Sequence, residues 1–239
     1  MKHIPNFITS LNLAAGFIAI IFAANGNMLT ASWLILAAMI FDFLDGFSAR
    51  LLKAYSAIGK ELDSLADVVS FGVAPGLIIY QLLNDSLSLY APMIVYSDGI
   101  KAILIMIIPV IMPVCAALRL AIFNIDTTQA TTFKGLPTPA NALAVISVVI
   151  AGHYSPSAIF SSFIGSPILL IIFTVILSLM MVSRIPLLSL KFSNMKLKGN
   201  EGRLMLAGLV VVSFAIFGIN AAPLIIPLYF IASLLSLLF

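Results

Sequence analysis

Long apolar segments are the feature of this sequence that most restricts its fold. Of its 239 residues, 62% are hydrophobic and only 9% are charged, whereas soluble proteins average about 25% charged residues. A helix of about 20 apolar residues crosses a bilayer core, so we predict an all-α polytopic membrane protein with about eight transmembrane helices. The predicted spans cover residues 8–24, 28–52, 58–81, 101–123, 139–152, 159–182, 204–219 and 222–238.

The distribution of Lys and Arg predicts how these helices are oriented. Cytoplasmic loops of membrane proteins carry an excess of both residues. If both termini are cytoplasmic and the spans alternate, Lys101 alone falls on the opposite side. We therefore expect a multi-pass protein of the cell's cytoplasmic membrane, with its first apolar segment retained rather than cleaved. The predicted cytoplasmic cations are Lys2, Arg50, Lys53, Lys60, Arg119, Lys134, Arg184, Lys191, Lys196, Lys198 and Arg203. The net charge of the chain is only +3, and its cations are scattered along the sequence, so nucleic-acid binding is not indicated.

Four carboxylates interrupt the apolar pattern between residues 42 and 67. Asp45 is three positions after Asp42, and Asp67 is four positions after Asp63, so each pair shares one face of a helix. One charge at the bilayer centre costs about 2.5–3.5 kcal/mol on insertion scales, and four unpaired charges would cost on the order of 10 kcal/mol. We expect cations to meet them, at a site open to the cytoplasm.

Small residues accompany both carboxylate pairs. Gly46 and Ala49 share the face of Asp42, and Gly59 shares the face of Asp63. A short connection joins the two helices, so they can pack antiparallel with these faces together. A bulky ligand would then fit against the backbone at Gly46 and Ala49.

Two divalent cations would balance the four carboxylates. Ligands that are all oxygen atoms favour Mg²⁺, Mn²⁺ or Ca²⁺ over zinc. Two such cations held by carboxylates are common where displacement occurs at phosphorus. The sequence contains two His residues, of which His3 lies near the N-terminus and His153 falls on the opposite side of the predicted membrane. We therefore expect a carboxylate to act as any general base.

Two other interpretations of the carboxylates stay open. Intramembrane acids also line the paths of ion transporters, although these acids gather at one side and no inverted repeat is visible. A purely structural role beside a neighbouring Arg fits four acids at these spacings poorly. In the same way, Asn6, Thr9 and Asn12 are interpreted either as lining the cytoplasmic mouth or as capping the first helix. Gly72-x-x-x-Gly76 matches a helix-packing motif, but Pro75 within it favours a helix break.

The stretch from Asp42 to Asp67 resembles a family signature. Its pattern, D-x2-D-G-x2-A-R-x8-G-x3-D-x3-D, is similar to that of the CDP-alcohol phosphotransferases at all eight specified positions. Flanking segments resemble the phosphatidylserine synthase branch of this family, with one departure, because Ile122 stands where the branch often has a second Arg. These segments are Ile4–Gly16, Asp67–Gly76, Leu118–Asn124, Phe133–Ala142 and Ser183–Lys191.

The resemblance implies a reaction and an organisation. In it, L-serine attacks CDP-diacylglycerol to give phosphatidylserine and CMP, with two divalent cations as cofactors. A catalytic core of six helices would occupy residues 1–190, followed at 191–239 by part of a basic loop and a hairpin that looks generic. The family also implies a homodimer.

Roles follow from the same resemblance. One metal would be held by Asp42, Asp45 and Asp63, and the other by Asp42, Asp63 and Asp67, with Asp67 also the general base. The residues expected to bind the CDP group are Gly46, Ala49, Arg50 and Gly59.

The acceptor site is predicted from nearby polar residues. Serine's carboxylate needs a cation, for which Arg119 and Lys134 are candidates, with Asn124 as a polar helper. Arg119 is equally well interpreted as an interfacial side chain. Arg184 could reach a phosphate or, with the rest of its loop, anionic lipid. Another alcohol, such as glycerol 3-phosphate, inositol phosphate or an amino-alcohol, remains an alternative acceptor, and the donor could be diacylglycerol- or archaeol-based.

Overall fold

The computed structural model describes residues 3–90, 99–126, 133–155, 157–188 and 200–236. Lys2, Lys191, Lys196 and Lys198 of the predicted cytoplasmic set lie outside these residues. Helices account for nearly all of the described chain, and two strands of two residues each pair antiparallel. The elements are α1 (Ile4–Ala24), α2 (Met28–Leu51), α3 (Ala57–Asp67), η1 (Val68–Val73), α4 (Ala74–Tyr90), α6 (Gly99–Ile107), η2 (Ile108–Val110), α7 (Ile111–Ile125), β1 (Phe133–Lys134), α8 (Thr138–Tyr154), α9 (Ala158–Ile164), α10 (Pro167–Val182), β2 (Pro186–Leu187), α11 (Glu201–Phe217), η3 (Gly218–Leu224) and α12 (Ile225–Leu235).

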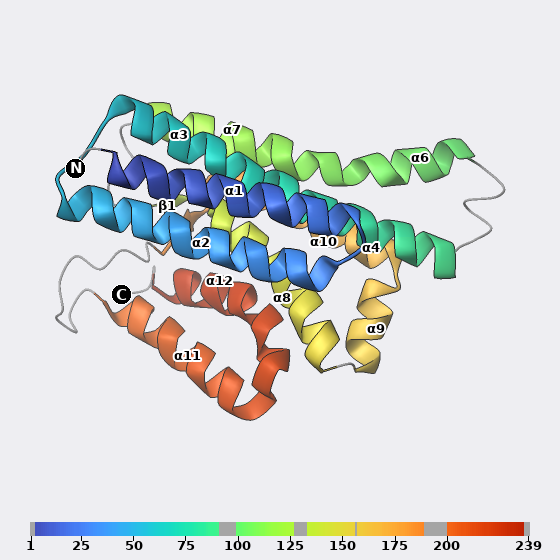
Figure 1. Cartoon of the computed structure of the whole chain (residues 1–239). Coiled ribbons are helices and arrows are strands. Elements are labelled where there is room, and N and C mark those ends of the chain that lie inside the picture. The colour runs from blue at the N-terminus through green and yellow to red at the C-terminus, as the bar shows by residue number, and fades with distance from the viewer. Residues whose placement is uncertain (1–2, 91–98, 127–132, 156, 189–199, 237–239) are drawn as a thin grey trace.

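The helices confirm the predicted all-α polytopic class. Among the described residues, five helical stretches are long and apolar enough to cross a membrane, or six if the bent pair α9 and α10 is one span. The predicted count of about eight is higher for two reasons. Helix α8 has only 17 residues, and the last two predicted spans lie in one helical stretch, Glu201–Leu235. That stretch turns back on itself at η3, so α11 and α12 still form a hairpin (Figure 1).

The long helices run side by side and their ends alternate (Figure 1). Helix α1 begins, α2 ends, α3 begins and α12 ends at one end of the bundle. Seven described cations, in or next to helix ends, belong to this end, and Lys101 at the start of α6 belongs to the other. Both described chain ends are thus on one side, as predicted. That this side is cytoplasmic stays a prediction.

Helices α1 and α2 pack through small residues. Ala19 and Ala23 of α1 are fully buried, as are Ala31 and Ala38 of α2. Small residues let helix backbones approach closely in membranes, where apolar lipid gives little drive for association. This contact holds α2, and with it Asp42, at a fixed place beside the third span.

The third span continues through Pro75, so the predicted break is wrong. A π-helical turn, η1, precedes Pro75, and the Ala74 amide donates to the carbonyl oxygen of Val69. Pro75 has no N–H to donate, and in an α-helix its donor would serve the carbonyl of Phe71. The side-chain amide of Asn141, on α8, donates to that carbonyl instead at 3.2 Å. A buried acceptor is thereby satisfied and the helix continues.

Gly16 marks the closest approach of α1 to this π-helical turn. A methyl group on Gly16 would lie 2.7 Å from the Cα atom of Ser70, and backbone cannot move aside as a flexible side chain does. We expect Gly16→Ala to lower the free energy of unfolding by about 1–3 kcal/mol, as overpacked cores do. Thermal unfolding in detergent measures this.

Gly208 on α11 is the matched control for Gly16. A methyl group there meets no atom within 4 Å, and Ala is favoured over Gly in a helix by about 1 kcal/mol. Gly208→Ala should therefore be neutral or stabilising. Equal effects of the two substitutions would contradict the close approach at Gly16.

Candidate active site

The structure brings three of the four aspartates together. Asp42, in the second half of α2, meets Asp63 and Asp67 of α3, and one carboxylate oxygen from each lies within 4.8 Å of the others. Asp63 and Asp67 are one turn apart on one face of α3. Helix α1 packs against both α2 and α3, which make little contact with each other, so the predicted direct antiparallel packing of these two helices is wrong and their aspartates meet through the side chains. Ser56 caps the start of α3 by accepting from the Gly59 amide at 2.9 Å.

Asp45 lies outside this group of three. Its side chain is only 5% exposed, and its Oδ2 atom has no hydrogen-bond partner. Asp45 does not line the cavity that the other three share. Its predicted role as a ligand of one metal is neither supported nor contradicted by this placement and stays a prediction.

The chemistry of the three carboxylates fits divalent cations. Their donor atoms are all oxygen, which hard cations such as Mg²⁺ and Mn²⁺ prefer. The Oδ1 atom of Asp63 is buried without a hydrogen-bond partner. In the part of the chain that the structure describes, no Lys or Arg lies within 4.0 Å of these carboxylates. Like charges this close need a counter-charge, so the arrangement suits a bound metal.

Asn12 contributes to the site from α1. Its side-chain amide donates to Asp67 Oδ1 at 3.2 Å, and Ser70 Oγ donates to the backbone carbonyl of Asn12 at 3.1 Å. Asn12 is fully buried. It therefore neither lines an open mouth nor caps the helix, which were the two interpretations from sequence. The amide leaves one oxygen of Asp67 free to face the cavity.

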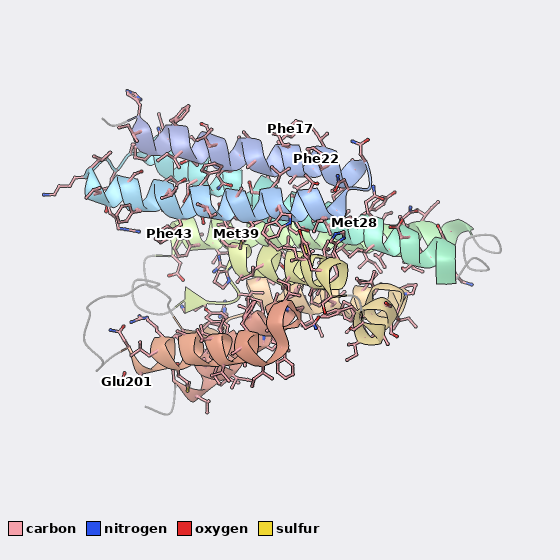
Figure 2. The ribbon with its side chains drawn as sticks, turned by 60° about the horizontal axis from the view of Figure 1, so that its bottom comes forward. Phe17, Phe22, Met28, Met39, Phe43 and Glu201 are labelled. Atoms are coloured by element: carbon pink, nitrogen blue, oxygen red, sulfur yellow. The ribbon has the colours of Figure 1, made fainter. Side chains whose placement is uncertain are left out.

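The three carboxylates line a cavity of about 520 Å³ between α2, α3, α7, α8 and the C-terminal hairpin. Lys60, Ser64, Arg119 and Asn124 add polar atoms, and the rest of the lining is largely apolar. Figure 2 shows Met39, one of the lining residues, on the part of α2 near α8. The apolar lining residues include Met39, Leu120, Phe123, Leu143, Leu188, Leu206, Ile225 and Ile226.

A second cavity, of about 340 Å³, adjoins the first. Arg119, Lys134 and Arg184 line it together with Asp126, and Arg119 and Phe123 line both cavities. Three of the four predicted acceptor residues therefore converge. Lys134 Nζ lies 3.7 Å from Asp126 Oδ2. Arg119 is 8% exposed with no hydrogen-bond partner at Nε, which contradicts an interfacial side chain.

The fourth predicted acceptor residue, Asn124, belongs to the first cavity. Its side-chain amide donates to Ser64 Oγ at 2.9 Å, and its backbone carbonyl accepts from Lys60 Nζ at 2.8 Å. Lys60 is thereby held at the rim rather than beside the carboxylates. These contacts join the end of α7 to α3.

The residues predicted to bind the CDP group lie one to two helical turns from the aspartates along α2 and α3. A methyl group on Gly46 would meet Arg50 Nη1 at 3.7 Å, an ordinary van der Waals distance. Gly59 approaches α1, since a methyl group there would lie 2.8 Å from Asn6 Oδ1. None of Gly46, Ala49, Arg50 and Gly59 lines either cavity. Their nucleotide-binding role stays a prediction.

The fold and the cavities together define a multi-pass membrane protein with a carboxylate centre inside an amphipathic cavity. The chain belongs to the CDP-alcohol phosphatidyltransferase family, whose sequence profile matches residues 2–217. This confirms the family that the motif indicated.

Named relatives are 32–38% identical to this chain over the aligned residues. CDP-diacylglycerol–serine O-phosphatidyltransferase of Bacillus subtilis is 38% identical over 77% of this chain and 89% of its own length. The Helicobacter pylori protein of the same name is 32% identical over 98% of this chain and 91% of its own length. Archaetidylserine synthase of Methanothermobacter thermautotrophicus is 35% identical over 64% of this chain, but the match spans only 60% of that relative.

Proposed function

We propose that this protein transfers the phosphatidyl group of CDP-diacylglycerol to L-serine, giving phosphatidylserine and CMP. The observation that carries the proposal is the cluster of Asp42, Asp63 and Asp67 in a cavity whose lining is otherwise largely apolar. The names of the Bacillus and Helicobacter relatives support serine as acceptor and a CDP-lipid as donor.

In the proposed mechanism, Asp42, Asp45, Asp63 and Asp67 would hold two divalent cations, chosen from Mg²⁺, Mn²⁺ and Ca²⁺. Bound cations would neutralise the pyrophosphate of the donor and stabilise the departing CMP. The oxygen of Asp67 that Asn12 does not engage would accept the proton of the serine hydroxyl. The serine oxygen bonds to the β-phosphorus, and the bond from that phosphorus to the oxygen of CMP breaks.

The second cavity is the proposed acceptor site. Arg119, which lines both cavities, would bind serine's carboxylate while the hydroxyl points toward Asp67. Lys134 and Arg184 make the surroundings positive, and Asn124 would orient the acceptor. Gly46, Ala49, Arg50 and Gly59 would bind the CDP group on the other side of the aspartates.

CMP release tests the proposed reaction. Purified protein is mixed with CDP-diacylglycerol, Mg²⁺ or Mn²⁺, and each candidate alcohol in turn. Release of CMP that depends on serine is the expected result. Release only with glycerol 3-phosphate, inositol phosphate or an amino-alcohol would replace serine within the family. No release with any alcohol, together with ion flux in vesicles, would favour a carboxylate-gated transporter. Running CDP-archaeol in parallel identifies the donor, a question raised by the archaeal relative's name.

Arg119→Gln should raise the KM for serine by about 10- to 100-fold, because hydrogen bonds to charged groups contribute about 1.5–3 kcal/mol. Inhibition by CMP should stay unchanged, which shows that the carboxylate centre is intact. Lys101→Gln, at the opposite end of the bundle, is the control and should leave the KM for serine as it is. An unaltered KM in Arg119→Gln would remove this residue from the acceptor site.

The setting of the reaction is part of the proposal. Lys and Arg gather at one end of the helices, as they do on the cytoplasmic side of membrane proteins. This supports the proposal that the protein lies in the cytoplasmic membrane with its active site facing the cytoplasm. A core in residues 1–190, a following segment at 191–239, and a homodimer are proposed from the family resemblance.

A further inference from the structure

The C-terminal hairpin is anchored at the edge of the first cavity. Tyr229 Oη of α12 donates to the backbone carbonyl of Leu188 at 2.9 Å, and the Leu188 amide donates to Ser233 Oγ at 3.1 Å. Leu188 directly follows β2, which pairs with β1. Figure 1 shows the hairpin lying against one side of the bundle beside α8. Its position is therefore fixed to the segments that also carry Lys134 and Arg184.

The hairpin supplies part of the apolar lining of that cavity. Leu206 of α11 and Ile225, Ile226 and Tyr229 of α12 all line it, together with the α2 and α3 aspartates. A ligand that filled only the carboxylate end would leave this wall facing water, which is unfavourable for apolar surface. An occupant with a charged end and an apolar end satisfies both halves of the cavity.

We infer that the C-terminal hairpin forms the wall that holds the first part of the donor lipid's acyl chains. The inference rests on the proposed function, since it takes a CDP-lipid as the occupant. The pyrophosphate then lies at the aspartates, and the lipid chains pass along Leu206, Ile225 and Ile226. Tyr229 acts as a positioning residue, because its hydroxyl ties α12 to Leu188.

Photo-crosslinking locates the chains without relying on turnover. A CDP-diacylglycerol that carries a diazirine close to the acyl carbonyl is bound to the full-length protein in detergent, irradiated and analysed by mass spectrometry. We expect crosslinks in the peptides of 201–236, reduced by excess unlabelled CDP-diacylglycerol. Crosslinks confined to outward-facing parts of α6 and α7 would overturn the inference. Crosslinking measures where the donor binds and does not depend on which alcohol is the acceptor. The proposal for the acyl chains and the proposal for serine can therefore be refuted independently.

Kinetics test the same wall with side-chain truncation. The double variant Leu206→Ala, Ile225→Ala should raise the KM for CDP-diacylglycerol in mixed micelles by about 3- to 10-fold, a modest factor because the lipid leaves surroundings that are themselves apolar. Inhibition by CMP, which has no acyl chain, and the KM for serine should stay within about two-fold, the scatter expected for unperturbed sites.

Val211→Ala is the matched control on the hairpin. Val211 lies on α11 and is 67% exposed, so it faces away from the cavity. We expect wild-type kinetics from it. If the double variant raises the inhibition constant for CMP as much as the KM for the donor, the hairpin supports the whole site rather than the acyl chains, and the inference is wrong.

Discussion

Asp67→Asn is expected to lower the turnover number for CMP release by about 10²- to 10⁴-fold, the usual contribution of a general base. Asn has nearly the shape of Asp and retains Oδ1, which accepts from Asn12 at 3.2 Å. The fold and the position of α1 should therefore be preserved. Donor binding, measured by photo-crosslinking, and inhibition by CMP should persist, so the loss falls on proton transfer rather than on binding.

Asp67 is also a proposed metal ligand, so the experiment must separate the two roles. Turnover is measured across a metal titration for the wild type and for Asp67→Asn. If saturating metal restores turnover, Asp67 acts as a ligand and another group takes the proton. Glu61→Gln is the control, because Glu61 lies on the same helix and is exposed. It should behave like the wild type.

Asp42→Asn is expected to shift the metal titration itself. Asp42 is the α2 member of the group of three and is proposed to touch both cations. Losing one carboxylate ligand should raise the metal concentration at half-maximal activity by about 10- to 100-fold or more, since even the residues that support metal ligands have effects of that size. Metal binding to the protein, followed by calorimetry without substrates, should weaken in parallel.

Asp45→Asn provides a graded comparison for Asp42→Asn. Asp45 lies outside the group of three and is proposed to hold only one cation, so its titration should shift less. Asp85→Asn, an exposed position on α4, should not shift it at all. A metal titration unchanged in Asp42→Asn would remove Asp42 from the proposed pair of metal sites.

The carboxylate centre was predictable because its information is local. Helical spacing puts Asp63 and Asp67 on one face of α3, and the short link from α2 keeps Asp42 close to them along the chain. The same spacing predicted Asp45 with the others, whereas the structure leaves it buried outside the group of three. Helix α1 packs against both α2 and α3, so the placement of the two α2 carboxylates involves three helices, and no pattern along one helix records it.

Other parts of the site depend on contacts between distant segments. The side chain of Asn12 reaches Asp67, which is 55 positions away in the sequence. The side chain of Asn141 reaches the carbonyl of Phe71, 70 positions away, and replaces the donor that Pro75 lacks. A lone Asn in an apolar helix has many possible partners, so its role could not be assigned from sequence. The hairpin gave no signal either, because its lining residues Leu206, Ile225 and Ile226 are the apolar residues that any membrane span contains.

The sequence by itself determined the all-helical membrane class, the gathering of Lys and Arg at one end of the helices and the family. It also determined which aspartates are candidates for the site. These properties follow from composition, from helical periodicity and from a motif confined to residues 42–67. Only the tertiary structure decided that Asp42, Asp63 and Asp67 form the group, that Arg119 is buried between two cavities, and that the hairpin closes one of them. Such outcomes depend on how side chains from separate helices fill a shared space, because the pattern along each helix leaves its neighbours unspecified.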